Sequence, residues 1–231
     1  MTQPVPEDLE VDGPPLSPAD SLALIDAEQG RRARRIQVGA ALTCGVWGVA
    51  YLVSFGLWYL TREAELPGLV AGVVTVVLFV GALVFSAWYG VRAGYGVRGP
   101  SRVSAAMYGC SWTISFFALT AVNVGLELRG VSGDLDILLW SGSSLLLAGA
   151  LYLAGGALFH SWVDYVVGAW TMIAAAGSVF AGVPGNFLVL SLAGGGGFLA
   201  QAVFYGWLSR CGRVDGTGGA ERALGVNVPT T

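Results

Sequence analysis

Residues 31–60 read RRARRIQVGAALTCGVWGVAYLVSFGLWYL, a cluster of four arginines followed by a stretch that carries no charge from position 36 to position 60. About 20 apolar residues in an α-helix cross the roughly 30 Å hydrocarbon core of a bilayer. Lipid offers no partner to backbone N–H and C=O groups, so an apolar stretch of this length has to be a helix. Residues 36–60 therefore predict a membrane-spanning helix, with arginines anchoring its first end.

Five further stretches of the chain lack charged residues and are long enough to cross a bilayer. Because short links join them, neighbouring spans must run up and down through the membrane. We expect an all-α fold, a polytopic membrane bundle of six transmembrane helices. The five stretches are residues 67–91, 103–126, 137–158, 165–181 and 187–208.

The composition agrees with a membrane protein and excludes several functions. Hydrophobic residues make up 55% of the chain and charged residues 12%, whereas a soluble domain carries about 25% charged residues. The chain has no lysine, so neither a Walker A phosphate loop nor Schiff-base chemistry is encoded. One histidine and three scattered cysteines exclude a clustered metal site. We expect no enzyme activity, no cofactor and no bound metal.

Arginines are distributed unequally between the two sides of the predicted bundle. Of the 12 basic residues, four precede the first span, three lie in the link at 92–102 and three follow the last span. Positively charged residues in short loops remain on the cytoplasmic side. We therefore expect both termini in the cytoplasm, in a multi-pass protein of the plasma (cytoplasmic) membrane.

The chain divides into four predicted segments. Residues 1–16 are acidic and rich in proline, which is typical of a disordered tail. Ser17, followed by a proline, is typical of a helix start, and we expect residues 17–35 to form a short amphipathic helix on the cytoplasmic membrane surface. Residues 36–208 are the six-helix transmembrane domain, and residues 209–231 are a disordered cytoplasmic tail.

Aromatic residues recur near one end of the spans. An F-x-x-W pattern closes the second, fourth and sixth spans, and a tryptophan follows small residues in each odd span. The recurrence favours three tandem helical hairpins related by a pseudo-threefold axis. An ordinary belt of interfacial aromatic residues also explains it. The residues concerned are Phe85, Trp88, Phe159, Trp162, Phe204 and Trp207, with Trp47, Trp112 and Trp170 in the odd spans.

No Asp, Glu, Lys, Arg or His lies within the six predicted spans. The absence of ionisable residues there argues against proton-coupled transport.

A run of four glycines marks the middle of the sixth span. The glycines weaken the helix and leave a groove in its surface. This groove either packs against another helix or receives a substrate. Its residues are Gly194, Gly195, Gly196 and Gly197.

Arginines and tyrosines at the cytoplasmic side are candidates for contact with lipid headgroups or a partner protein. A plain positive-inside anchor would also explain them. The candidates are Arg31, Arg32, Arg34, Arg35, Tyr89, Arg92, Tyr95, Arg98 and Arg102.

His160 and Asp164 form a candidate polar pair at the cytoplasmic junction of the fourth and fifth spans. Residues four apart share a helix face, so the two side chains are expected together. Their expected role is a hydrogen bond that caps the hairpin, because a single His and Asp make a poor metal site.

Several motifs resemble a family of uncharacterised six-helix integral membrane proteins of high-GC bacteria. The resemblance rests on DSLALI at residues 20–25, the arginine-rich junction after it, RGPS at residues 98–101 and the glycine run at residues 194–197. Some members of this family are labelled permease-like. The resemblance implies a membrane location more than a mechanism.

Two functions follow as hypotheses. The first is a transport-related or permease-like subunit that uses the glycine groove and depends on partners, such as a separate ATPase or another cytoplasmic protein. The second is a non-transporting membrane anchor or regulatory scaffold that recruits a cytoplasmic partner. Membrane lipid is an expected partner of both, and no nucleic acid is expected.

Overall fold

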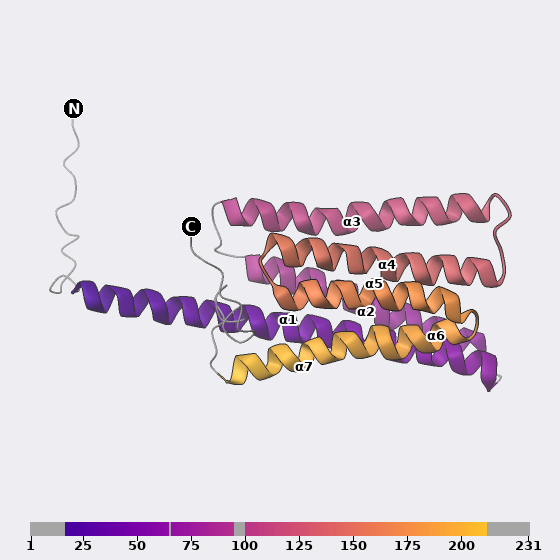
Figure 1. Cartoon of the computed structure of the whole chain (residues 1–231), viewed down its shortest axis with the longest axis horizontal. Helices are drawn as coiled ribbons and strands as arrows, with labels where there is room; N and C mark the ends of the chain where they lie inside the picture. Colours follow the sequence, from indigo (N-terminus) through magenta and orange to yellow (C-terminus); the bar gives the residue numbers. More distant parts are fainter. Residues whose placement is uncertain (1–16, 65, 95–99, 212–231) are drawn as a thin grey trace, which may run out of the picture.

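The computed structural model describes residues 17–64, 66–94 and 100–211 of the chain. These residues form helices joined by short links, with no strand among them (Figure 1). The helices are α1 (Pro18–Glu63), α2 (Gly68–Gly94), α3 (Pro100–Glu127), α4 (Asp134–Leu158), α5 (Trp162–Ala181), α6 (Gly185–Val189), the π-helical segment η1 (Leu190–Gly195) and α7 (Gly196–Arg210).

Six of the helical stretches in the described part of the chain are long and apolar enough to cross a membrane. Five are α1 to α5, and the sixth is Gly185–Arg210, in which α6, η1 and α7 follow one another without a break. The predicted all-α, six-span membrane bundle is confirmed. The predicted tail at residues 1–16, and residues 212–231 of the C-terminal tail, lie outside the described residues.

α1 is much longer than the first apolar stretch. Ser17 caps its start, since the Asp20 backbone N–H donates to Ser17 Oγ at 3.1 Å. The helix then continues to Glu63, so residues 17–35 do not form the separate short helix that we expected. Strong helix formers fill the junction, and the single Gly30 costs only about 1 kcal/mol. Figure 1 shows the first part of α1 extending beyond the ends of the other helices.

α1, α4, α5 and the sixth span enclose the core. α1 packs extensively against the sixth span and α4 against α5, whereas α3 contacts mainly α4 at the edge of the bundle. Figure 1 shows α3 along that outer edge. The buried core residues are Tyr51, Leu145, Ala174, Ala175, Leu190 and Phe198.

The packing does not repeat as three equivalent hairpins. The two most extensive interfaces, α4 with α5 and α1 with the sixth span, join helices from different hairpins of the expected repeat. The F-x-x-W tryptophans instead face outward, as interfacial aromatic residues do. Trp88 is 54% exposed, Trp162 55% and Trp207 49%.

Two glycines bring the backbones of α4 and α5 into contact. A Cβ on Gly156 would lie 2.5 Å from the Tyr165 backbone nitrogen, and a Cβ on Gly168 would lie 2.5 Å from the Leu153 backbone nitrogen. Small residues permit such close approach between membrane helices, where dispersion contacts replace the hydrophobic driving force. The close contact places the first turn of α5 beside the end of α4, where the candidate site lies.

Candidate functional site

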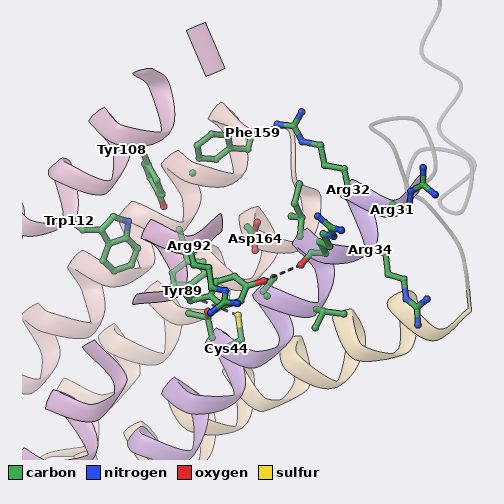
Figure 2. Close-up of a pocket in the computed structure, with 18 of the residues that line it drawn as sticks. Arg31, Arg32, Arg34, Cys44, Tyr89, Arg92, Tyr108, Trp112, Phe159 and Asp164 are labelled. Atoms are coloured by element: carbon green, nitrogen blue, oxygen red, sulfur yellow. Dashed lines mark hydrogen bonds between the residues drawn. The ribbon is translucent and has the colours of Figure 1, made fainter. Parts of the chain in front are cut away.

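A pocket of about 1460 Å³ opens at one end of the bundle and is lined by residues of α1, α2, α3, α4 and α5. We call this end the arginine end, because five arginines line the pocket there. Figure 2 shows Tyr108, Trp112 and Phe159 on one side of the opening and the arginines of α1 on the other. The five arginines, which we call the arginine rim, are Arg31, Arg32, Arg34, Arg35 and Arg92.

One stripe of α1 runs from the mouth of the pocket into its interior. Arg32, Arg35, Gly39 and Thr43 follow one another at helical spacings of three and four, and all line the pocket. Arg31 forms an ion pair with Glu28 at 2.9 Å. Within the described part of the chain, the other arginines of the rim have no carboxylate at salt-bridge distance. The rim therefore carries positive charge that a ligand can neutralise.

Tyr89 of α2 fixes the second side of the mouth to α1. Its hydroxyl donates to the Arg35 carbonyl oxygen at 3.2 Å. Its ring fills the space beside Gly39, where a Cβ would lie only 2.1 Å from Tyr89 Oη. Three residues later the Arg92 guanidinium lies over the Trp88 ring, 5.4 Å from its centroid. Tyr89 thus holds α2, and with it Arg92, beside the arginines of α1.

Aromatic rings from α3 and α4 form the opposite wall. Tyr108 donates to the Leu151 carbonyl oxygen at 2.7 Å and packs edge-to-face on Phe159, with ring centroids 5.4 Å apart. Trp112 packs edge-to-face on Tyr152 at 5.7 Å. These contacts lock the rings against one another, and they direct the Tyr108 hydroxyl to backbone instead of toward a ligand.

Cys44 lies deep in the pocket beside Tyr152. The Cys44 sulfur and the Tyr152 hydroxyl are 4.0 Å apart, and the thiol is almost completely buried. Cys110, on α3, is exposed on the outside of the bundle. The two cysteines therefore differ in environment, although both lie within apolar stretches of the sequence.

Asp164 lines the pocket from the first turn of α5. Gln201 Nε2 donates to Asp164 Oδ1 at 2.6 Å, and the Tyr205 hydroxyl donates to the same oxygen at 3.1 Å. Ser161 caps the helix by accepting from the Asp164 backbone N–H at 3.3 Å. The carboxylate is thereby held by two side chains of the sixth span, at a position where it faces the other pocket-lining groups.

The position of Asp164 corrects the prediction that the spans carry no ionisable group. The fifth candidate span is Trp162–Ala181, which begins three positions before the apolar stretch at 165–181 and includes Asp164. A helix can start before its apolar residues because a cap and hydrogen-bonding partners satisfy the polar groups of its first turn.

His160 does not share a helix face with Asp164, as the spacing had suggested. It lies in the turn between α4 and α5 with a backbone φ of 55°, and its side chain is exposed. The left-handed conformation ends α4 and turns the chain, so helical periodicity does not extend from His160 to Asp164. Asp164 takes its hydrogen bonds from Gln201 and Tyr205 instead.

The glycine run does not line the pocket, and its members differ in their surroundings. A Cβ on Gly195 would lie 2.7 Å from the Leu52 backbone nitrogen, and one on Gly197 would lie 2.8 Å from the Trp170 ring. A Cβ on Gly194 would meet Tyr51 at an ordinary 3.6 Å, and one on Gly196 would meet nothing within 4 Å. The run therefore serves helix packing at Gly195 and Gly197, the first of the two roles predicted for it.

The other predicted contact residues are only partly assembled. The four arginines of α1, Tyr89 and Arg92 line the pocket. Tyr95 and Arg98 lie outside the described residues, as does the side chain of Arg102. Sequence reasoning missed Tyr108, Trp112, Tyr152 and Cys44 as site residues. The spacing of four between Tyr108 and Trp112, which places both on one face of a helix, was a usable signal.

Comparison of the chain with protein-family models, with curated proteins and with solved structures found no match. The chemistry of the pocket residues is thus the ground for a functional proposal.

The pocket is lined by side chains of two kinds that bind ligands in proteins. Guanidinium groups bind carboxylates and phosphates through paired N–H donors, and the aromatic wall offers rigid apolar area. The described residues contain no group of three His, Cys, Asp or Glu side chains placed to hold a metal ion.

Proposed function

We propose that the protein is a transport-related, permease-like membrane subunit whose ligand enters the pocket at the arginine end. The observation that carries the proposal is the pocket itself, about 1460 Å³ in volume and lined by five helices. A cavity of this size supports a transport role, because a ligand that crosses the membrane has to leave the surrounding lipid or water and enter the bundle.

The pocket replaces the glycine run as the proposed ligand site. α1 lies directly against Gly195 and Trp170 against Gly197, so these positions have no room for a ligand. The pocket instead combines cationic, aromatic and carboxylate groups at one opening. Pockets that bind small molecules commonly combine apolar walls with a few convergent polar groups.

The proposal also covers the location of the protein in the cell and the proteins it works with. The excess of arginine at one end of the bundle supports a cytoplasmic position for that end and for both termini, in the plasma membrane. The pocket would then open toward the cytoplasm. Because the chain has no lysine for a Walker A loop, any ATP-driven step would need a separate ATPase. The resemblance to permease-like six-helix proteins of high-GC bacteria agrees with this proposal.

Thiol labelling at position 40 tests whether the pocket is open to water, because Cys44 itself is almost completely buried. In a variant with Ala40→Cys and the three native cysteines replaced by serine, the one thiol lines the pocket from a half-buried position of α1. A membrane-impermeant methanethiosulfonate reagent should label it from one side of sealed vesicles. The additional substitution Thr43→Trp fills the pocket from α1 and should abolish this labelling.

The matched control keeps Cys110 instead, with Cys44→Ser and Cys211→Ser. Cys110 is exposed on the outer face of α3 and should be shielded from the aqueous reagent by lipid. If the thiol at position 40 reacts only after denaturation, and from neither side of the vesicle, the open pocket is refuted and the proposed function with it.

The alternative function as an anchor or scaffold is favoured by one observation, the first part of α1. This segment extends beyond the bundle (Figure 1), and its apolar side chains are exposed, with Leu22 at 62% and Ile25 at 51%. A partner or the membrane surface could cover them. The double variant Leu22→Glu and Ile25→Glu should release a cytoplasmic partner under the scaffold hypothesis. Under the transport hypothesis it should leave the pocket and the labelling at position 40 unchanged.

A further inference from the structure

We infer that the ligand of the pocket is an anionic amphiphile, with a phosphate or carboxylate head at the arginine rim and an apolar chain against the aromatic wall. The inference rests on the proposed function, since it names the class of ligand for the same pocket. Three properties of the pocket lead to it: the sign of its charge, the chemistry of its wall and the place of its one deep carboxylate.

The charge of the pocket favours an anion. Five arginines line it against two carboxylates, Glu28 and Asp164, and Glu28 is already paired with Arg31. Arg32 and Arg35 lie on the stripe of α1 that leads inward to Gly39. Arginine forks bind phosphate and carboxylate oxygens with two parallel hydrogen bonds, which lysine cannot do. The rim therefore selects a compact anionic group.

The wall favours an apolar chain. Tyr108 and Phe159 pack edge-to-face, as do Trp112 and Tyr152. The wall therefore presents aromatic rings to the ligand. The Tyr108 hydroxyl donates to backbone and the Tyr152 hydroxyl lies beside the Cys44 thiol, which leaves few polar groups on the wall. The volume of about 1460 Å³ exceeds the roughly 300–1,000 Å³ of ordinary small-molecule pockets. Such a space suits a long chain.

Asp164 sets the orientation of the ligand. Gln201 and Tyr205 hold its carboxylate in place, so it cannot turn away from the pocket. A second negative charge close to it in a medium of low dielectric would be repelled strongly. The anionic head is therefore kept among the arginines, and the uncharged chain is the part that passes Asp164.

Protection of a pocket thiol from labelling tests the inference. The protein is reconstituted in phosphatidylcholine nanodiscs with Ala40→Cys as the only thiol, the three native cysteines being replaced by serine. A second protein carries Thr43→Cys in the same background, and both positions line the pocket and are half-buried. Dodecyl phosphate at ten times its dissociation constant should slow labelling about tenfold, because only the unoccupied fraction reacts. Inorganic phosphate and dodecyltrimethylammonium should give no protection at the same concentration.

Substitution of two rim arginines is the second part of this test. Arg32→Gln with Arg35→Gln should weaken protection by dodecyl phosphate about tenfold to a hundredfold, as expected for lost charge-assisted hydrogen bonds. The matched control is Arg62→Gln, at the opposite end of α1 and outside the pocket. Nanodiscs containing phosphatidylglycerol should protect the thiol without added ligand if the natural source is a bilayer lipid. Protection only by the soluble amphiphile identifies a ligand taken from water.

The outcomes separate the inference from the proposed function. If both thiols react freely and neither dodecyl phosphate nor phosphatidylglycerol protects them, the anionic amphiphile is refuted and the open pocket still stands. Equal protection by inorganic phosphate removes the apolar chain from the inference, and equal protection by dodecyltrimethylammonium removes the anionic head. If neither thiol reacts from either side, the proposed function and the inference are both refuted.

Discussion

Gln201 donates a 2.6 Å hydrogen bond to Asp164 and so ties the sixth span to the first turn of α5. Gln201 is 2% exposed, and the carboxylate that it holds belongs to the pocket at the arginine end. Tyr205 donates to the same oxygen from one turn further along α7. A buried amide thus positions a charged group of the candidate site.

Replacing Gln201 with leucine should destabilise the protein. The variant removes the shorter of two side-chain donors from a partly buried carboxylate, which costs about 1–3 kcal/mol. The free energy of unfolding, measured by denaturant titration in detergent micelles, is the quantity to compare. Gln29→Leu makes the same change at an exposed position of α1 and should have little effect. Equal stability of the two variants would contradict a structural role for the Gln201–Asp164 bond.

Alanine substitutions in the glycine run should have opposite effects at neighbouring positions. Gly195→Ala forces a methyl group against the backbone of Leu52 and should cost about 1–3 kcal/mol. Gly196→Ala meets nothing within 4 Å and should stabilise the helix by up to about 1 kcal/mol. Thermal unfolding of the two variants in the same detergent checks this difference. A similar loss of stability at both positions would show that the helix, and not its contact with α1, sets the requirement for glycine.

His160→Gly should raise stability by about 1 kcal/mol. The residue has a φ of 55°, a conformation that glycine adopts without the steric cost that a Cβ imposes. If His160 instead formed the pair with Asp164 that the sequence suggested, its removal would lower stability. Unfolding measurements on His160→Gly and His160→Ala separate the two cases, since alanine keeps the strained conformation but cannot form the pair.

Cysteines introduced one at a time at positions 98 and 134, in a background without native cysteines, test the proposed orientation. The cysteine at 98 follows the second span and should react with an impermeant reagent only from the cytoplasmic side. The cysteine at 134, at the start of α4, should react only from the opposite side. Labelling with the sides exchanged would place the pocket on the other face of the membrane.

The boundaries of the spans show how far sequence reasoning reaches. The apolar stretch at 36–60 lies inside α1 and the one at 103–126 inside α3, because an apolar stretch in lipid must satisfy its own backbone. The ends were harder to place. α1 starts at Pro18 and α5 at Trp162, since polar residues that are good helix formers or are capped extend a helix past its apolar part.

The sequence by itself determined that the chain is an all-α bundle of six spans and where its arginines gather, because both follow from runs of residues along the chain. Only the tertiary structure decided which helices meet. It brought Gln201 to Asp164, 37 positions away, and Cys44 to Tyr152, 108 positions away. A soluble helix shows its packing face as an apolar stripe. A membrane span is apolar all round, so the arrangement depends on fine packing at small residues, which the pattern of apolar residues does not reveal.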